Sequence, residues 1–435
     1  MNHASLYICY FPTDEPLVHT QVLPYLRGVA RAGVRMHLLT FEKRNWWRKG
    51  ELARRRELKR ELAARGVNWH ALKYHKRPSV AATSFDIVSG AIYSAWLMVR
   101  HRIDIVHARA HVPGVIGLAL KLAMRAKLIF DLRGLMAEEY VDNGVWSEGS
   151  LPFRMAKNAE RALLKFSDRI VVLTEALKSA LTEPPNVSVP AGKVFVIPCC
   201  TDLTQYELAE SDAEAQSTSL TLVYVGSLMG RYMLREMIAF FKVLQARRSG
   251  SRFLILTRAN KTEVESAFEN QGVDPDSYSI ISAEPRLVPA LISAGDFAIS
   301  FVKPTHAVIG MSPTKIGEYL AAGLPVVATR GGDIDSVLLS QGAGVVVDEF
   351  GAADYQSAAD RMLGMLEQGG VSERCREVAR TCFSLSDVGA PRYIALYRTL
   401  GCFTEAGGDE ARDAVDLEIA VDPRSGADAS IGQKA

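Results

Sequence analysis

Residues 6–40, LYICYFPTDEPLVHTQVLPYLRGVARAGVRMHLLT, open with a short run of apolar residues and then change to a helical period. We expect a strand over 6–11, a helix over 18–32 that ends at Gly33, and a second strand over 34–40. Such an alternation of buried strands and helices predicts a parallel sheet with helices on both faces. The same pattern recurs further along the chain, with expected strands at 103–107, 127–131 and 168–174.

A second series of strands and helices follows an interruption in the pattern. Residues 207–219 are rich in Ala, Ser, Glu and Asp and contain almost no large apolar side chains, which is typical of a linker. We therefore predict an α/β chain with two doubly wound, Rossmann-like domains that face each other across a cleft. The expected division is an N-terminal domain over 1–200, a linker over 201–219, a second domain over 220–385, a C-terminal helix over 386–402 that packs back toward the first domain, and a disordered acidic tail over 403–435.

Composition excludes several classes of protein. A hydrophobic content of 48% in 435 residues excludes wholesale disorder, and a net charge of +2 argues against a dedicated nucleic-acid binder. The six cysteines have no metal-ligand spacing, so we expect reduced thiols in a cytoplasmic protein. The charge-free apolar run at 87–99 is shorter than the roughly 20 residues of a membrane-spanning helix, and the N-terminus lacks the features of a signal peptide.

The most informative segment is 311–328, MSPTKIGEYLAAGLPVVA. Ser312 is a good N-cap and Pro313 suits the first helical position, so a helix is expected to begin there, after the expected strand at 296–301. The free backbone N–H groups of its first turn would hold a diphosphate, and Lys315 would add a positive charge. Glu318, about one turn further on, would accept hydrogen bonds from ribose hydroxyls. Alternatively, Lys315 and Glu318 form an exposed i,i+3 pair on an ordinary amphipathic helix.

This segment resembles the donor-nucleotide motif of the family 4 glycosyltransferases, which have the GT-B architecture. Ser-Pro-x-Lys-x-x-Glu-Tyr, followed by Ala-Gly-x-Pro-Val, carries the resemblance, which extends over roughly residues 5–400. It implies an enzyme that uses a nucleotide-diphosphate sugar as donor, retains the anomeric configuration and needs no metal or other cofactor. It also implies that Glu318 binds the ribose and that the diphosphate is contacted by Ser312, Pro313, Thr314 and Lys315.

Two positions depart from the family pattern. Many members carry a glutamate eight residues before the ribose-binding one, and here that position is Gly310. The family also often has Gly-Arg after the first strand of the second domain, where this chain has Gly226 and Ser227. Gly226 suits close approach of the backbone to a ligand. Arg231 is either a substitute phosphate ligand or a solvated helix residue.

Candidate catalytic residues of the first domain follow two expected strands. The family usually has a histidine in the loop after 103–107, and the matching position is Arg109, with His111 as the nearest histidine. Either side chain would stabilise charge as the sugar–phosphate bond breaks. Asp131 and Arg133 end the next strand and are candidates for contacts to the acceptor or the transition state.

A basic patch lies at 43–77, with 13 Lys and Arg residues against three Glu, and it begins beside Trp46 and Trp47. A basic helix flanked by tryptophan is typical of a protein that docks on an anionic membrane surface, and a solvated basic helix is the alternative. No nucleic-acid recognition motif accompanies the charge. The resemblance favours a lipid partner, on the cytoplasmic face of the cell membrane.

The leading hypothesis is therefore a metal-independent, retaining glycosyltransferase of the hexosyltransferase type. Its acceptor would be the hydroxyl of a glycan or a lipid-linked glycan, in polysaccharide or glycoconjugate synthesis. One alternative is a nucleotide-sugar epimerase or hydrolase on the same fold, with Asp131 and His111 as its acid and base. The other is a non-catalytic subunit that binds a sugar nucleotide.

Overall fold

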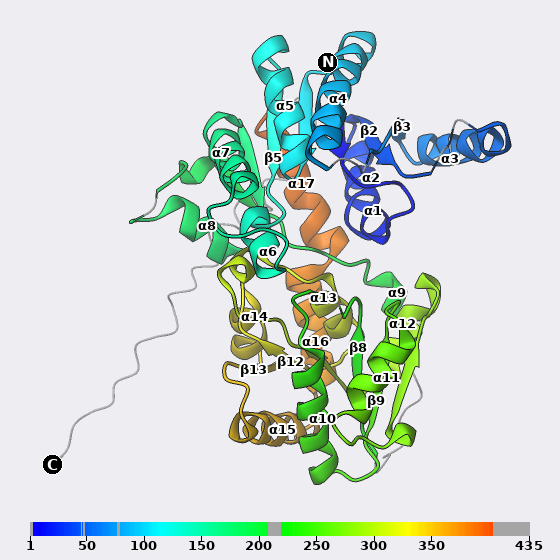
Figure 1. Ribbon diagram of the computed structural model, residues 1–435, viewed down its shortest axis with the longest axis vertical. Coiled ribbons are helices and arrows are strands. Elements are labelled where there is room, and N and C mark those ends of the chain that lie inside the picture. Colours follow the sequence, from blue (N-terminus) through cyan, green and yellow to red (C-terminus); the bar gives the residue numbers. More distant parts are fainter. Residues whose placement is uncertain are drawn as a thin grey trace.

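The computed structural model describes residues 3–402 except 45, 47, 76–78, 186, 208–218 and 229. The chain forms two α/β domains that lie one above the other (Figure 1). The expected tail over 403–435 and most of the expected linker over 201–219 lie outside the described residues.

The first domain contains a seven-stranded, all-parallel sheet with the strand order β3-β2-β1-β4-β5-β6-β7. Its strands are β1 (Ala4–Cys9), β2 (Arg35–Glu42), β3 (Val67–Lys73), β4 (Ile105–Arg109), β5 (Lys127–Asp131), β6 (Arg169–Val172) and β7 (Val194–Val196). Its helices are α1 (Pro16–Gln21), α2 (Leu23–Arg31), α3 (Leu52–Ala64), α4 (Ser79–His101), α5 (His111–Met124), α6 (Met136–Asp142), α7 (Leu151–Phe166) and α8 (Glu175–Thr182).

The second domain contains a six-stranded parallel sheet with the order β10-β9-β8-β11-β12-β13. Its strands are β8 (Thr221–Val225), β9 (Arg252–Leu256), β10 (Tyr278–Ile281), β11 (Phe297–Ser300), β12 (Val326–Thr329) and β13 (Gly344–Val347). The helices that follow β7 in the chain are α9 (Thr204–Glu207), α10 (Leu234–Arg247), α11 (Lys261–Glu269), α12 (Val288–Ser293), α13 (Thr314–Ala321), α14 (Ile334–Ser340), α15 (Ala352–Glu367), α16 (Val371–Val378) and α17 (Ala390–Arg398).

Both strand orders reverse next to the first strand of the sheet, which is the doubly wound arrangement that the alternating pattern predicts. The central strands β1 and β4 are buried along their whole length, because helices cover both faces of the sheet. The predicted fold class is confirmed. The domains meet beyond the carboxyl ends of their strands, at the place of the predicted cleft, where Thr174 after β6 bonds Ile309 after β11.

Two local expectations were wrong. The single helix expected over 18–32 is divided into α1 and α2 at Val22, because Pro24 has no N–H to continue the hydrogen bonding of α1. Strand β3, at the edge of the first sheet, was not expected. It alternates buried Val67, Trp69 and Ala71 with more exposed residues inside the strongly basic region.

The chain crosses between the domains twice, and the two crossing segments pair with each other. The Thr201 N–H donates to Phe383 O at 2.8 Å, and the Leu385 N–H donates to Thr201 O at 2.9 Å. After the second crossing, α17 packs on the first domain, where it contacts α2 (Figure 1). Arg392 Nη1 donates to Val196 O at 2.9 Å, and Lys127 Nζ donates to Leu400 O at 2.6 Å.

Within the described part of the chain, one helix, at Val80–His101, is long and apolar enough to cross a membrane by length and composition alone. The helix is longer than the charge-free run at 87–99, because Asp86, which precedes that run, does not end the helix. Asp86 is fully buried, and it accepts hydrogen bonds from Tyr10 Oη and the His75 N–H at 2.6 and 3.0 Å. One face of the helix therefore belongs to the folded domain.

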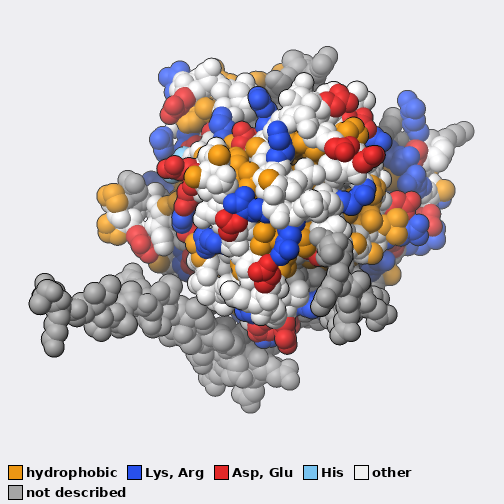
Figure 2. Space-filling model, turned by 90° about the horizontal axis from the view of Figure 1, so that it is seen from below, with side chains coloured by type: hydrophobic (Ala, Val, Ile, Leu, Met, Phe, Trp, Pro, Cys, Tyr) orange, Lys and Arg blue, Asp and Glu red, His pale blue; other side chains and the backbone are white. Residues whose placement is uncertain are grey.

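The basic patch lies on α3, which projects from the side of the first domain (Figure 1). Figure 2 shows Lys and Arg side chains gathering on that same side of the molecule. Leu62 is the buried residue of α3. Trp46 does not contribute to this surface, because it is 3% exposed and its Nε1 donates to Glu42 at 2.9 Å. Trp47 lies outside the described residues.

Candidate functional site

Helix α13 carries most of the residues expected to bind the donor. It begins at Thr314, with Pro313 in an extended conformation at the N-cap position. The expectation that Ser312 caps the helix was wrong. The Ser312 hydroxyl instead accepts a hydrogen bond from the Cys199 N–H, at 3.1 Å, where the chain leaves the first domain.

Lys315, in the first turn of α13, is buried against two tyrosines. Its Nζ donates to Tyr224 Oη at 3.0 Å, and it lies 4.2 Å from the Tyr224 ring centroid and 3.9 Å from that of Tyr232. The alternative of an exposed surface pair is therefore wrong for Lys315, which is 7% exposed. Burial lowers the pKa of Lys315 to about 7 and raises that of half-buried Glu318 to about 7. The Lys315 charge opposes the rise at Glu318.

Gly226 lies directly beside this lysine. It follows the last residue of β8 with a φ of +120°, a conformation that glycine adopts without strain. A Cβ atom at this position would lie 3.0 Å from Lys315 Nζ. The structure thus brings together two residues that are far apart in sequence and were both expected to bind the donor.

Arg231 connects the two domains. Its Nη2 lies 3.0 Å from Glu139 Oε2 on α6, and its Nη1 lies 3.5 Å from Met311 Sδ. The alternative of a solvated helix residue was wrong, because the side chain is 19% exposed and precedes α10. The guanidinium lies beside the loop that leads to Ser312, which is a suitable position for a phosphate ligand.

Gly310, at the position of the usual glutamate, is buried in the contact between the domains. A Cβ atom there would lie 2.9 Å from Leu177 Cδ2 and 3.6 Å from the Gly134 Cα atom. The adjacent contacts also join the two domains: Thr174 Oγ1 donates to Ile309 O at 2.6 Å. In this arrangement a glutamate side chain would require Leu177 to move.

On the first-domain side, Asp131 is the centre of a buried cluster at the end of β5. Arg109 and Arg133 each place a guanidinium nitrogen 3.6 Å from its carboxylate. Tyr7 and Tyr393 donate hydrogen bonds to Oδ2 at 3.3 and 3.2 Å, so α17 contributes to the cluster. Burial lowers the pKa of neighbouring His107 to about 4, and its imidazole is therefore neutral at pH 7.

His111 belongs to a separate network. Its Nε2 lies 3.0 Å from Glu160 Oε2, and Lys157 pairs with both Glu160 and Glu138. The change of direction between Arg109 and His111 is made by Ala110, at φ 65° and ψ −174°. A non-glycine residue held in this region costs on the order of 1–3 kcal/mol, and such residues cluster at functional sites.

Cys199 links the Asp131 cluster to the donor segment. Arg133 Nη2 lies 3.0 Å from Cys199 Sγ, and the Cys199 N–H bonds Ser312 Oγ. Sequence reasoning missed Cys199 and Tyr224 as neighbours of the expected site residues. Glu139 is indicated by the sequence as an acidic residue after the strand that ends at Asp131, where it either lines the site or begins a solvated helix.

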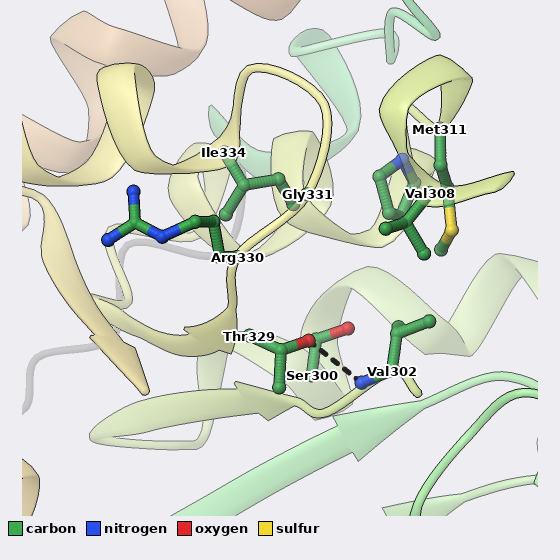
Figure 3. Close-up of a pocket in the computed structure, with 9 residues that line it drawn as sticks. Ser300, Val302, Val308, Met311, Thr329, Arg330, Gly331 and Ile334 are labelled. Carbon is green, nitrogen blue, oxygen red and sulfur yellow. Dashed lines mark hydrogen bonds between the residues drawn. The ribbon is translucent and has the colours of Figure 1, made fainter. Parts of the chain in front are cut away.

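A small pocket opens at the carboxyl ends of β11 and β12, beside the start of α13 (Figure 3). The residues that line it include Met311, Pro313, Thr329 and Arg330. Thr329 Oγ1 accepts a hydrogen bond from the Val302 N–H at 2.9 Å. The volume of about 10 Å³ is close to the space that one water molecule needs. This pocket is therefore too small for a sugar nucleotide.

Comparison with known proteins identifies the two domains separately. A family model described as "Glycosyl transferase 4-like domain" matches residues 18–200, and one described as "Glycosyl transferases group 1" matches residues 219–368. No curated protein sequence matches the chain.

Solved structures share the fold over almost the whole chain. A glycosyltransferase from Rickettsia africae is 16% identical, with a TM-score of 0.65 over 92% of this chain and 98% of that one. Sucrose-phosphate synthase from Thermosynechococcus elongatus is 15% identical, with a TM-score of 0.66 over 92% and 99%. Anabaena HepE, in complex with UDP and glucose, is 13% identical, with a TM-score of 0.65 over 92% and 100%. Since glycosyltransferase family models match both domains, the chain belongs to the GT4-like glycosyltransferases of the GT-B fold.

Proposed function

We propose that this glycosyltransferase moves a hexosyl group from a nucleoside-diphosphate sugar to an acceptor hydroxyl, with retention of the anomeric configuration and without a metal ion. The observation that carries the proposal is the convergence of Lys315, Gly226 and the first turn of α13 at the carboxyl ends of the strands. A backbone that can approach a ligand, free N–H groups and a nearby ammonium group together suit a diphosphate. The HepE structure with UDP and glucose supports a donor of this class.

In the proposed reaction, the bond between the anomeric carbon and the diphosphate oxygen breaks while the acceptor oxygen bonds to that carbon on the same face. The acceptor proton passes to an oxygen of the departing diphosphate, so no enzymic nucleophile is needed. Lys315, the N-terminus of α13 and Arg231 would stabilise the leaving-group charge. Arg109, Asp131 and Arg133 would hold the acceptor side, where Arg133 reaches the donor segment through Cys199.

A donor needs more space than the pocket beside α13 provides. Ligand pockets for molecules of this size are typically about 300–1,000 Å³, far more than the pocket beside α13. We propose that the domains separate at the Arg231–Glu139 and Gly310–Leu177 contacts and that Lys315 turns from Tyr224 toward the diphosphate. Ser312 would exchange its contact with Cys199 for one with phosphate.

A panel of UDP-, GDP- and ADP-sugars, tested by thermal stabilisation and calorimetry, would identify the donor. Glu318→Ala should weaken binding of that donor by about 10–100-fold, as expected for the loss of hydrogen bonds to a charged group. Glu263→Ala, on an exposed helix of the same domain, is the matched control. Unchanged affinity of Glu318→Ala for every donor would overturn the site assignment.

The reaction class needs a separate assay. Labelled donor incubated with a lipid extract and excess chelator should give labelled product, with the anomeric configuration read by NMR. Turnover to an epimer or free sugar without acceptor would instead indicate the epimerase or hydrolase. Donor binding without transfer to any acceptor would indicate a non-catalytic subunit.

We propose further that the enzyme is cytoplasmic and that its first domain docks on an anionic membrane surface that carries a lipid-linked glycan acceptor for polysaccharide or glycoconjugate synthesis. Two surfaces support this docking. The exposed arginines of α3 complement anionic headgroups, each being worth about 1 kcal/mol near such a surface. Helix α4 exposes a stripe of large apolar side chains at helical spacing. These are Phe85, Val88, Ile92, Trp96 and Val99, each more than half exposed.

Vesicle sedimentation would test the docking and separate the two surfaces. The protein should sediment with vesicles rich in phosphatidylglycerol at low salt and be released as salt rises. Arg54→Gln with Arg56→Gln should reduce binding in a salt-sensitive way, whereas Ile92→Ser with Trp96→Ser should reduce it at every salt concentration. Lys261→Gln, on the second domain, is the control. No sedimentation at low salt would remove the proposal.

A further inference from the structure

Three histidines converge at the edge of the first sheet, away from the cleft. His37 lies on β2, His70 on the edge strand β3, and His101 is the last residue of α4. One ligand nitrogen from each lies within 4.8 Å of the other two. They are 31 or more residues apart in sequence and form no recognisable motif, so only the fold brings them together.

The geometry of the cluster suits a bound ion. His37 Nδ1 lies 3.1 Å from His70 Nε2, which is close to the separation of two nitrogens bound at about 2.0–2.1 Å to one tetrahedral ion. The His37 ring centroid lies 5.3 Å from that of His70 and 4.6 Å from that of His101. Binding one ion would draw the three nitrogens, now within 4.8 Å of one another, closer together.

We propose that His37, His70 and His101 form a binding site for a divalent transition-metal ion, most naturally Zn²⁺. Imidazole nitrogens are preferred ligands of Zn²⁺, and three of them leave a fourth position open. Oxygen-preferring ions such as Mg²⁺ and Ca²⁺ would find no carboxylate among these three ligands.

The surroundings favour an anionic fourth ligand. Imidazole binds a metal ion through an unprotonated ring nitrogen, so the hydrogen that His37 Nδ1 and His70 Nε2 now share would move to another nitrogen or leave when the ion binds. The charges of Arg35, Lys59 and Arg100 act on the cluster and are all positive. They favour a hydroxide or a small anion, rather than neutral water, at the fourth position.

The position of the site indicates a structural role. His37 lies in the amino-terminal half of β2, and His101 precedes β4, whereas the cleft borders the carboxyl ends of the strands. An ion there would fasten the edge strand β3, which pairs only with β2 in its sheet, to the end of α4. This inference is independent of the proposed transfer reaction.

Metal binding should be measured on the full chain without a polyhistidine tag, after treatment with a chelator. Titration with Zn²⁺ against a competing indicator should give one tight site per chain and a higher melting temperature. His70→Gln and His101→Gln should each weaken Zn²⁺ binding more than about 100-fold, because even second-shell changes cost 10–100-fold. His19→Gln and His306→Gln, both exposed and outside the cluster, are the matched controls.

A spectroscopic measurement tests the site without any variant. Co²⁺ in the unaltered protein should give the intense visible absorption of a four-coordinate ion. His101 is half-buried at a helix end, so His101→Gln should fold even if His70→Gln does not. Less than one equivalent of tight Zn²⁺, a six-coordinate Co²⁺ spectrum, or unchanged binding by His101→Gln would each overturn the proposal.

Discussion

Lys315 Nζ lies 3.0 Å from Tyr224 Oη, so the cation expected to bind the donor diphosphate is held by an aromatic side chain of its own domain. The contact keeps a buried amine next to Gly226, where the backbone leaves space for a ligand. The same burial brings its pKa close to neutrality. Two of our predictions depend on this relationship.

Lys315→Met should weaken binding of the donor nucleotide while keeping most of the side-chain volume. A hydrogen bond to a charged group contributes about 1.5–3 kcal/mol, which corresponds to roughly 10–100-fold in affinity. Calorimetric titration with the nucleoside diphosphate measures the change. Lys261→Met, at an exposed position, should bind as the unaltered protein does. Equal affinity of the Lys315 variant would show that the amine does not reach the diphosphate.

Donor binding should take up a proton at pH 8. The pKa of free Lys315 is about 7, so most of its amine is uncharged at that pH. An anionic diphosphate favours the charged form and raises the pKa, so the amine gains a proton on binding and affinity falls as pH rises from 7 to 9. Titrations in two buffers of different ionisation enthalpy measure the uptake. The uptake should disappear in Lys315→Met, and its persistence there would assign it to another group.

Asp131→Asn should destabilise the first domain strongly. The substitution leaves Arg109 and Arg133 buried without their shared carboxylate, and breaking a buried ion pair costs about 3–5 kcal/mol. Urea unfolding measures the loss. Asp360→Asn, which breaks the surface pair with Arg247, is the control and should leave the urea midpoint unchanged. An unchanged midpoint for Asp131→Asn would mean that the tyrosines and Cys199 suffice to hold the two guanidinium groups.

Gly310→Glu should push the domains apart. Its Cβ would lie 2.9 Å from Leu177 Cδ2, and overpacking of this kind costs about 1–3 kcal/mol. Small-angle scattering should show a larger radius of gyration. Leu177→Ala in the same chain removes the opposing side chain and should restore the smaller radius. If Gly310→Glu alone leaves the radius unchanged, the contact does not control the separation of the domains.

Much of the fold could be predicted from local pattern. The alternation of buried strands and helices indicated two doubly wound domains, and the segment around Lys315 indicated a helix beside the cleft. The boundaries were less predictable, because Ser312 bonds Cys199 instead of capping α13 and Pro24 divides the first helix. Strand β3 escaped detection because its alternation lies within a basic region.

The sequence alone determined the doubly wound fold class and the residue types at the ends of the strands. It could do so because hydrophobic periodicity, glycine and proline influence the backbone over only a few residues. The tertiary structure decided which distant side chains meet. It paired Arg231 with Glu139, placed Asp131 and His111 in separate networks, and assembled three histidines from β2, β3 and α4. Such encounters depend on sheet order, domain packing and the return of α17 to the first domain. Those contacts join residues far apart in the chain, where local pattern carries no information.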